Sequence, residues 1–171
     1  ASMDVEVPTE TYFDPNDQAA NLPSFFPALI KPNCGDSSIG ITQKAVVNNA
    51  EELINYLDHL HETLPGVPLL IQEYLQGAEY SVGLVGNPDK FEALPILEVD
   101  YSQLPSQLPK ILSYESKWDP DSPYWSDIRY KEATLDDETH RRLIHYSNRL
   151  FERLECRDYA RFDFRTDAEG R

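Results

Sequence analysis

The sequence predicts an α+β fold, because two stretches with helical periodicity lie among short stretches with the pattern of strands. In residues 49–64 the leucines recur at helical spacing and would lie on one face of a helix, and the leucines of residues 134–154 do the same. The strand-like stretches are separated by a few polar, Gly or Pro residues, which favours hairpins. We therefore expect mainly antiparallel sheets.

The first part of the chain is expected to contain a hairpin and a helix. Residues 1–24 mix acids, Asn, Gln and Pro without periodicity, which is typical of a linker or a tag-derived segment. Two strands, at residues 28–31 and 41–47, are expected on either side of a polar loop at 33–40. The helix that follows should begin at Asn49, because an N-cap Asn with Glu three positions later forms a capping box.

The rest of the chain is expected to form further strands around a second helix. Strands are expected at residues 69–73, 79–85, 91–99 and 161–165, with turns at 87–89 and 167–171. Thr134 with Asp137 resembles a capping box for the second helix. Residues 100–133 contain both tryptophans and are long for a connection without structure, and such loops are often lids or binding loops.

Composition excludes several classes of function. The 171 residues carry 15 Lys+Arg against 30 Asp+Glu, a net charge of -15, so nucleic acid and anionic membrane surfaces are disfavoured partners. The sequence contains no apolar run long enough to span a membrane and no signal-peptide pattern. Two cysteines, Cys34 and Cys156, are too few for a disulfide scaffold, so we expect a cytoplasmic protein.

Two groups of residues could bind a nucleotide. Lys31 stands at a strand end before the loop Gly35 to Gly40, where two glycines and two serines let backbone N–H groups converge on an anion, although a simple turn is the commoner reading. Gln72, Glu73 and the residues to Glu79 end an apolar strand and could bind an adenine edge and ribose hydroxyls; an ordinary strand and turn is the alternative.

Charged groups near the end of the chain could carry further chemistry. Arg161 and Asp163 lie two apart on a predicted strand and so on one face, where they could join a cation to a metal-binding carboxylate, or form a solvated surface pair. Lys117 is a candidate in a loop, where most lysines are merely solvated. The four histidines are expected on helix surfaces, and no cysteine nucleophile is expected at Cys34.

The order of these motifs along the chain is more specific to one protein family than any single motif is. Lys-Pro, a Gly/Ser loop, a helix, Gln-Glu-Tyr-Leu-x-Gly-x-Glu, Tyr-x-x-Lys, a helix and Ala-Arg-Phe-Asp-Phe follow one another from about Pro27 to Gly170. This order resembles the ATP-grasp ligases, and among them the D-alanine-D-alanine ligase family. The resemblance implies an ATP-grasp fold of two α+β lobes, residues 25–78 and 79–171, that enclose a nucleotide cleft and are incomplete at the C-terminus.

The resemblance also implies a reaction and roles for single residues. Mg-ATP would phosphorylate a carboxylate to an acyl phosphate, which an amine of a small amino-acid-like substrate then attacks. Arg161, which would stabilise the tetrahedral species, and Ser37 become catalytic residues, and Asp163 becomes a ligand of Mg2+. The implied ATP-binding residues are Lys31, Ser37, Ser38, Gly40, Gln72, Glu73, Leu75, Glu79 and Lys117.

The sequence departs from the family pattern at several positions. The loop reads Gly-Asp-Ser-Ser where Glu-Gly-Ser-Ser is usual, Gln72 replaces a common glutamate, and Trp118 stands where a substrate-orienting tyrosine is usual. The second pair of metal ligands should come just beyond Arg171, so we expect a fragment of a ligase that is weakly active or inactive by itself. A homodimer is one assembly left open.

Three functions remain as alternatives at this point. One is an ATP-grasp ligase, with D-alanine or another amino-acid-like substrate. The second is a nucleotide-binding or regulatory module that binds ATP without ligase turnover. The third is an interaction domain that uses its acidic surface and the loop from Trp118 to Trp125, and it should bind no nucleotide.

Overall fold

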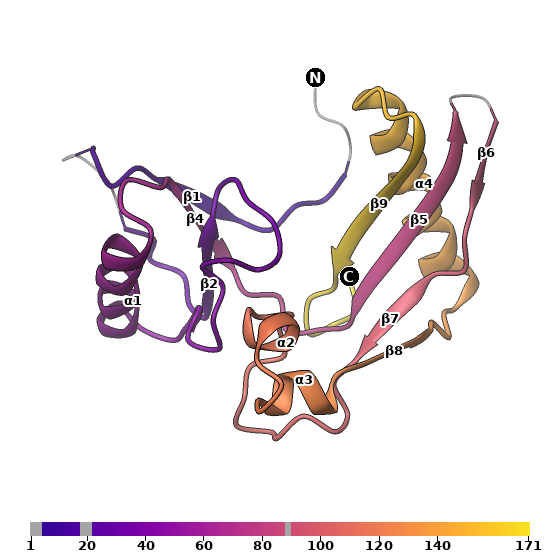
Figure 1. Cartoon of the computed structure of the whole chain (residues 1–171). Coiled ribbons are helices and arrows are strands. Elements are labelled where there is room, and N and C mark those ends of the chain that lie inside the picture. The colour runs from indigo at the N-terminus through magenta and orange to yellow at the C-terminus, as the bar shows by residue number, and fades with distance from the viewer. Residues whose placement is uncertain (1–4, 18–21, 88–89) are drawn as a thin grey trace. The chain divides into compact units, whose positions relative to one another are not determined.

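The structure is a computed structural model that describes residues 5–17, 22–87 and 90–171. The chain divides into two units, whose elements can be followed in Figure 1. The lysine unit, named for Lys31, comprises Pro8–Tyr74 and Tyr101–Ile128. The arginine unit, named for Arg161, comprises Ala1–Val7, Leu75–Asp100 and Arg129–Arg171.

The lysine unit is built on a four-stranded antiparallel sheet. Its order is β1 (Glu10–Phe13), β4 (Leu69–Glu73), β2 (Ala28–Pro32) and β3 (Val46–Val47). The α1 helix (Ala50–Thr63) lies along this sheet in Figure 1 and buries three side chains, Leu53, Tyr56 and Leu60. Ala28, Ile30 and Ile71 of the sheet are fully buried, so apolar burial holds this unit together.

The long segment at residues 100–133, which was expected within the second lobe, has structure of its own. It contains α2 (Glu115–Trp118) and α3 (Pro123–Asp127), and residues 101–128 belong to the lysine unit. Tyr124 of α3 is buried, and its hydroxyl donates a hydrogen bond of 2.8 Å to the carbonyl of Pro109. The expected boundaries, 25–78 and 79–171, therefore differ from those of the two units.

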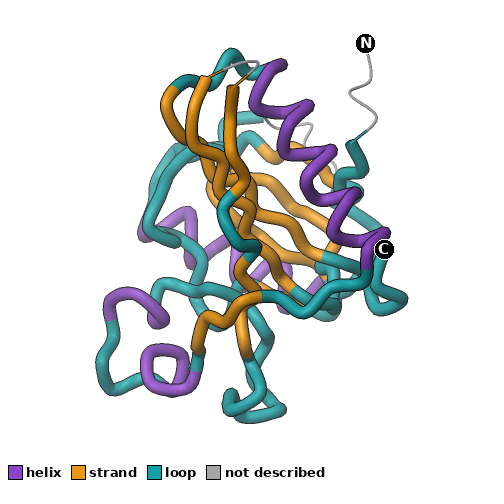
Figure 2. The backbone as a smooth tube through the Cα atoms, turned by 90° about the vertical axis from the view of Figure 1, so that its right-hand side faces the viewer, coloured by secondary structure: helices purple, strands orange, loops and turns teal. Residues whose placement is uncertain are grey.

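The arginine unit is built around β5 (Glu79–Asn87). One edge of β5 pairs along its length with β9 (Asp158–Arg165). Further antiparallel pairings join β5 to β6 (Lys90–Ala93) and β7 (Leu97–Asp100), and β7 to β8 (Arg129–Glu132). The α4 helix (Asp137–Arg153) runs along this sheet, as Figure 2 shows, and its Leu143 and Phe151 share a core with Val82 and Leu84.

Three sequence-based expectations about strands were wrong. Residues 10–13 are not part of a linker, because they form β1 on the edge of the sheet, paired with β4. The expected strand at 41–47 shrinks to β3, because Ala45 N–H bonds to the Thr42 carbonyl in a turn. The expected strand at 91–99 is two strands, β6 and β7, separated by a segment containing Pro95, which has no N–H for a sheet ladder.

The two long helices show one correct and one wrong cap. Asn49 caps α1 as expected, since its side chain accepts a hydrogen bond of 2.9 Å from Glu52 N–H. Thr134 does not cap α4. The carboxylate of Asp136 does so instead, and accepts from the N–H groups of both Glu138 and Thr139, each at 2.9 Å.

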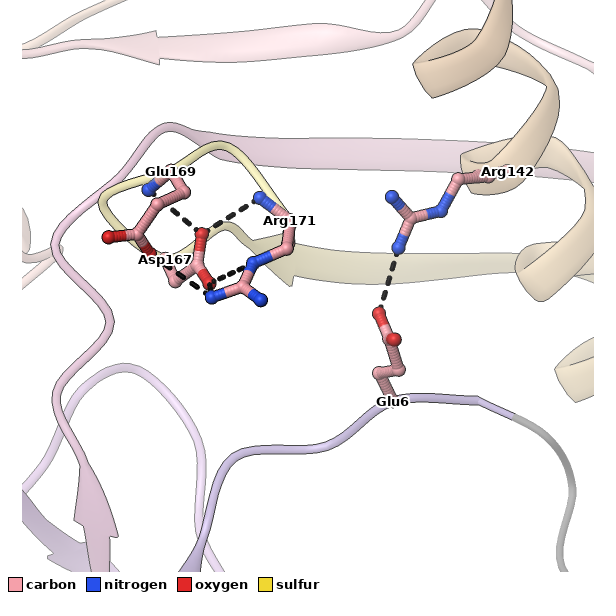
Figure 3. A network of polar contacts seen from close by, with 5 residues as sticks. All are labelled: Glu6, Arg142, Asp167, Glu169 and Arg171. Atoms are coloured by element: carbon pink, nitrogen blue, oxygen red, sulfur yellow. Dashed lines mark hydrogen bonds and ion pairs between the residues drawn. The ribbon is translucent and has the colours of Figure 1, made fainter.

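The expected turn at the end of the chain is confirmed. The carboxylate of Asp167 accepts hydrogen bonds from Glu169 N–H and Arg171 N–H and pairs with the Arg171 guanidinium (Figure 3). These contacts lower the pKa of Asp167. The tag-derived interpretation of residues 1–4 and the centre of the turn at 87–89 lie outside the described residues. Among the residues described, every helix is too short or too polar to cross a membrane.

Candidate functional site

Lys31 lies on the face of its sheet that carries polar side chains. In the strand register Leu29 is opposite Gln72, and Gln72 is opposite Glu10. Opposed residues share a face, and Lys31, two positions after Leu29, shares it too. Gln72 Nε2 donates a hydrogen bond of 2.8 Å to Glu10 Oε2. Gln72 is thus engaged with a neighbouring strand that the sequence did not reveal.

The ammonium group of Lys31 is partly withdrawn from water. Burial lowers its pKa, and the negative charge of Glu10 opposes that change only in part. A cation in such surroundings is incompletely solvated, so an anionic ligand can interact with it more strongly than with a fully exposed lysine.

The Gly/Ser loop adopts an unusual backbone conformation. Ser37 and Ser38 have φ angles of 55° and 58°, in the left-handed region that residues other than Gly rarely adopt. Ser38 is buried, and its Oγ donates a hydrogen bond of 2.7 Å to the carbonyl of Leu112. The hydroxyl of Ser38 is therefore already used within the chain.

Gly40 has a packing role at the end of the same loop. Its φ is 75°, and an added Cβ would lie 2.7 Å from Leu64 Cδ1 and 2.8 Å from Pro32 Cγ. A side chain at this position would therefore both strain the backbone and displace its neighbours. The Gly40 carbonyl accepts a hydrogen bond of 3.2 Å from the Tyr56 hydroxyl, which connects the loop to α1.

Lys117 is on a helix and not in a loop. It belongs to α2, in the same unit as Lys31 and the Gly/Ser loop, and it is exposed. The next residue, Trp118, donates a hydrogen bond of 3.1 Å from Nε1 to the Ser37 carbonyl. From the sequence, Trp118 was noted as a departure from a family pattern and as one end of a candidate interaction loop, and no local signal could have revealed this contact.

The expected adenine-binding residues Glu73 and Leu75 differ in their surroundings. Glu73 is exposed, and its N–H bonds to the Thr9 carbonyl at 2.8 Å. The Leu75 carbonyl accepts a hydrogen bond from Arg165 Nε. Leu75 also falls in the arginine unit, whereas Glu73 falls in the lysine unit.

Glu79, the expected ribose ligand, is half-buried in an ion pair. Its Oε2 lies 3.0 Å from Arg165 Nη1, and each side chain keeps only 17% of its surface exposed. Arg165 was not singled out from the sequence. The signal available was the strand alternation, which puts Arg161, Asp163 and Arg165 on one face.

Arg161 and Asp163 do meet, as expected, on one face of β9. Arg161 Nε and Nη2 donate to Asp163 Oδ1 and Oδ2 at 2.9 and 3.0 Å, and this pairing raises the pKa of Arg161. Ser81 Oγ on the neighbouring β5 donates to Asp163 Oδ1 at 2.7 Å. The two side chains remain 70% and 50% exposed, so both can exchange their contacts for a ligand.

Asp163 is the one carboxylate that the sequence analysis marked as a metal ligand. Among the described residues, no three His, Cys, Asp or Glu side chains gather as they would around a metal ion. Mg2+ is often held by one or two carboxylates together with substrate phosphates. Asp163 fits one such role, but only if its bonds to Arg161 are given up.

Comparison with known proteins decides the family. The family model described as "D-ala D-ala ligase C-terminus" matches residues 13–171. The chain belongs to this family. The resemblance inferred from the motif order is thereby confirmed.

Curated relatives of this ligase family extend well beyond the matched region. A D-alanine–D-alanine ligase of Aquifex aeolicus is 29% identical over 174 residues, which cover 99% of this chain and 52% of the relative. The D-alanine–D-alanine ligase of Desulfotalea psychrophila is 27% identical over 85% of this chain and 41% of the relative. The chain thus spans about half the length of the curated relatives it matches.

Solved structures show the fold of the ligase family. VanG D-Ala:D-Ser ligase from Enterococcus faecalis superposes with a TM-score of 0.71 at 22% identity, over 98% of this chain and 46% of that one. D-alanine–D-alanine ligase from Bacillus anthracis complexed with ATP gives 0.65 at 20% identity, over 96% and 46%. The expected α+β ATP-grasp fold with antiparallel sheets is confirmed.

Proposed function

We propose that this chain is the ATP-binding region of a carboxylate–amine ligase of the D-alanine–D-alanine ligase type. The observation that carries the proposal is the family match over residues 13–171. It is supported by the half-buried ammonium of Lys31 and by the Gly/Ser loop that follows Lys31 in the same unit, in which two serines have left-handed backbone conformations.

In the proposed reaction two bonds form in turn. A carboxylate oxygen of the substrate takes the γ-phosphoryl group of ATP, and ADP leaves. The nitrogen of an amine then attacks the acyl carbon, and inorganic phosphate leaves as the amide forms. Such transfers depend on positioning and charge neutralisation more than on a protein nucleophile. D-alanine or another small amino-acid-like molecule is the proposed substrate.

The cationic residues have the clearest roles in this proposal. Lys31 and Lys117 neutralise phosphate charge, and Arg161 stabilises the tetrahedral species formed by the amine. Asp163 would hold Mg2+, whose charge would help to neutralise the phosphates. For Asp163 and Arg161 to act in this way, their mutual contact must be exchanged for contacts with ligand.

The remaining residues of the proposal contact the nucleotide less directly. We assign the phosphates to the loop of Ser37, Ser38 and Gly40, with Ser37 also catalytic, the adenine to Gln72, Glu73 and Leu75, and the ribose to Glu79. The side chains of Ser38 and Glu79 have partners within the chain, so Ser38 would contribute its backbone, and Glu79 would have to share its carboxylate with Arg165.

A nucleotide-binding module without turnover is the second candidate. It is favoured by two facts about the proposed metal ligand: Asp163 is bonded to Arg161, and among the described residues no three possible metal ligands gather.

Two further parts of the proposal concern location and assembly. A cytoplasmic location suits the free cysteines Cys34 and Cys156, and a homodimer is an assembly that sedimentation can test.

A calorimetric titration with Mg-ATP tests the binding part of the proposal. The wild-type chain should bind, and Lys31→Ala should bind about 10- to 100-fold more weakly, the effect of losing one charged contact. Lys44→Ala is the matched control, since Lys44 is exposed in the same unit, and it should match the wild type. A wild-type chain that binds no ATP would contradict the proposal.

Phosphate release separates the ligase from the second candidate. If ATP is consumed only when D-alanine or another amino acid is added, the ligase is supported. If ATP binds but no amino acid promotes phosphate release, the module without turnover is the better description.

A further inference from the structure

The Gly/Ser loop and the residues that follow it are bound by the segment 112–118 of the same unit. Just after the loop, Tyr114 N–H donates to the Ile41 carbonyl at 2.7 Å, and Gln43 N–H donates to the Glu115 carboxylate at 3.1 Å. Within the loop, the Ser37 carbonyl accepts a hydrogen bond of 3.1 Å from Trp118 Nε1. These residues are far apart in the sequence, so the contacts fix the loop from outside its own local structure.

The loop needs such support because of its backbone. A left-handed conformation costs an L-residue about 1–2 kcal/mol, and Ser37 and Ser38 adopt it in succession. Strained residues of this kind persist when their surroundings hold them. Ser38 is held by its buried bond to the Leu112 carbonyl, and the peptide of Ser37 is held by the indole of Trp118.

Trp118 itself is well placed to act on the loop without being part of the core. It is 57% exposed, so the indole adds little to the apolar core of the unit. The ring of Tyr114 lies 6.4 Å from the Trp118 ring, between centroids, and the two rings are tilted by 35°. This aromatic pair limits the orientations of the indole.

We propose that Trp118 is a positioning residue, whose indole N–H keeps the Gly/Ser loop in its left-handed conformation before a nucleotide binds. The nucleotide in this statement rests on the proposed function, whereas the contact between Trp118 and the loop does not. A loop that is already ordered loses less conformational entropy when its ligand binds, which strengthens binding. Loss of the indole N–H should therefore loosen the loop and weaken ATP binding together.

Hydrogen exchange tests the loop without any ligand. The N–H groups of Ile39 and Ile41 donate within the loop, to the carbonyls of Asp36 and Ser38. In Trp118→Phe both should exchange about 2- to 10-fold faster, the effect of losing one neutral hydrogen bond. Trp125→Phe is the matched control, because Trp125 is also exposed but lies on α3. In this variant the N–H groups of the Gly/Ser loop should exchange as in the wild type.

Titration with Mg-ATP then tests positioning. Trp118→Phe should bind about 2- to 10-fold more weakly than the wild type, and Trp125→Phe equally well. Unchanged exchange at Ile39 and Ile41 in Trp118→Phe overturns the proposal, and so does faster exchange with unchanged ATP affinity. If exchange rises but the wild type binds no ATP, the support of the loop by Trp118 stands and the proposed function fails.

Fluorescence offers a test that leaves Trp118 in place. The chain has two tryptophans, so in Trp125→Phe the tryptophan emission comes from Trp118 alone. A loop held before binding predicts the same emission maximum with and without Mg-ATP. A large shift on adding Mg-ATP would show that the indole rearranges and would overturn the proposal.

Discussion

Strand β9 carries two ion pairs on the same face of one sheet, and they differ in burial. Arg165 with Glu79 keeps 17% of each side chain exposed, and Arg165 also bonds to the Leu75 carbonyl. Arg161 with Asp163 keeps 70% and 50% exposed. The first pair ties β9 to β5, and its Arg165 also ties β9 to Leu75, four residues before β5 begins. The second pair joins two residues of a single strand.

The comparison indicates which pair serves the fold and which can serve a ligand. Removing one partner of a buried pair leaves a charge without compensation in a poorly solvated place, which is costly. An exposed pair is worth little, because water solvates either charge alone. We therefore expect Glu79–Arg165 to be mainly structural and Arg161–Asp163 to be exchangeable, although the sequence alone marked Glu79 for a ligand.

The largest expected effect follows from removing Arg165. Arg165→Met should lower the free energy of unfolding by about 2–4 kcal/mol, because Glu79 would lose its charged partner in a half-buried position. Arg161→Met, on the same strand, should lower it by less than about 1 kcal/mol. Urea unfolding of both variants measures the difference, and equal losses would remove the distinction between the two pairs.

The second prediction concerns the exposed pair and the nucleotide. Asp163→Asn should weaken Mg-ATP binding by about 10-fold or more, because it removes a charged ligand group, while stability changes by less than about 1 kcal/mol. Asp158→Asn is the control, an exposed carboxylate on the same strand but the opposite face. Calorimetry should show unchanged affinity for the control; equal affinity in both variants would argue against a role for Asp163.

The third prediction extends the argument on burial to Lys31 in the other unit. Burial lowers the pKa of Lys31, so the charged form is disfavoured in the folded chain. Lys31→Met should therefore raise the free energy of unfolding at neutral pH by about 0.5–2 kcal/mol, a usual range for stabilising changes. Lys44→Met, exposed in the same unit, should leave it nearly unchanged.

The pH dependence of stability gives a second test of the lowered pKa of Lys31. Between the lowered pKa and 10.5 the unfolded chain binds more protons at Lys31 than the folded chain does. The stability of the wild type should thus rise relative to Lys31→Met as the pH increases through that window. Urea unfolding across alkaline pH measures the difference, and a constant or falling difference would contradict a desolvated Lys31.

The smallest effect is expected for an exposed pair between distant residues. Glu6 Oε2 lies 2.8 Å from Arg142 Nη2 (Figure 3). The Arg142 guanidinium also lies over the Tyr146 ring. Glu6→Gln should lower the free energy of unfolding by less than about 0.5 kcal/mol, and salt should reduce the difference further. A loss above about 1 kcal/mol, measured at low and high salt, would show that exposure alone does not rank these pairs.

The parts of the fold that the sequence predicted correctly depend on local patterns. Asn49 and Glu52 are three residues apart, and the strand at 161–165 shows its alternation within five residues. Thr134 was the wrong cap because Asp136, two residues later, offers a carboxylate that accepts two N–H groups at once. Local chemistry thus narrows a helix start to a few positions, and geometry selects among them.

The candidate site was predicted less completely, because its contacts join distant residues. The order of motifs identified the family and the residues worth testing. It did not reveal that Ser38 is bonded to Leu112, that Glu79 is paired with Arg165, or that Gln72 is bonded to Glu10. Each of these contacts joins residues at least 62 positions apart, and a single sequence carries no local sign of them.

By itself the sequence determined the long helices, most strands, the acidic character of the chain and the likeness to ATP-grasp ligases. Only the tertiary structure decided that residues 10–13 form an edge strand, that residues 101–128 join the unit of Lys31, and that Trp118 holds the Ser37 peptide. The physical reason is that helices and alternating strands are encoded by neighbouring side chains, whereas strand partners and side-chain contacts depend on where the folded chain brings distant residues together.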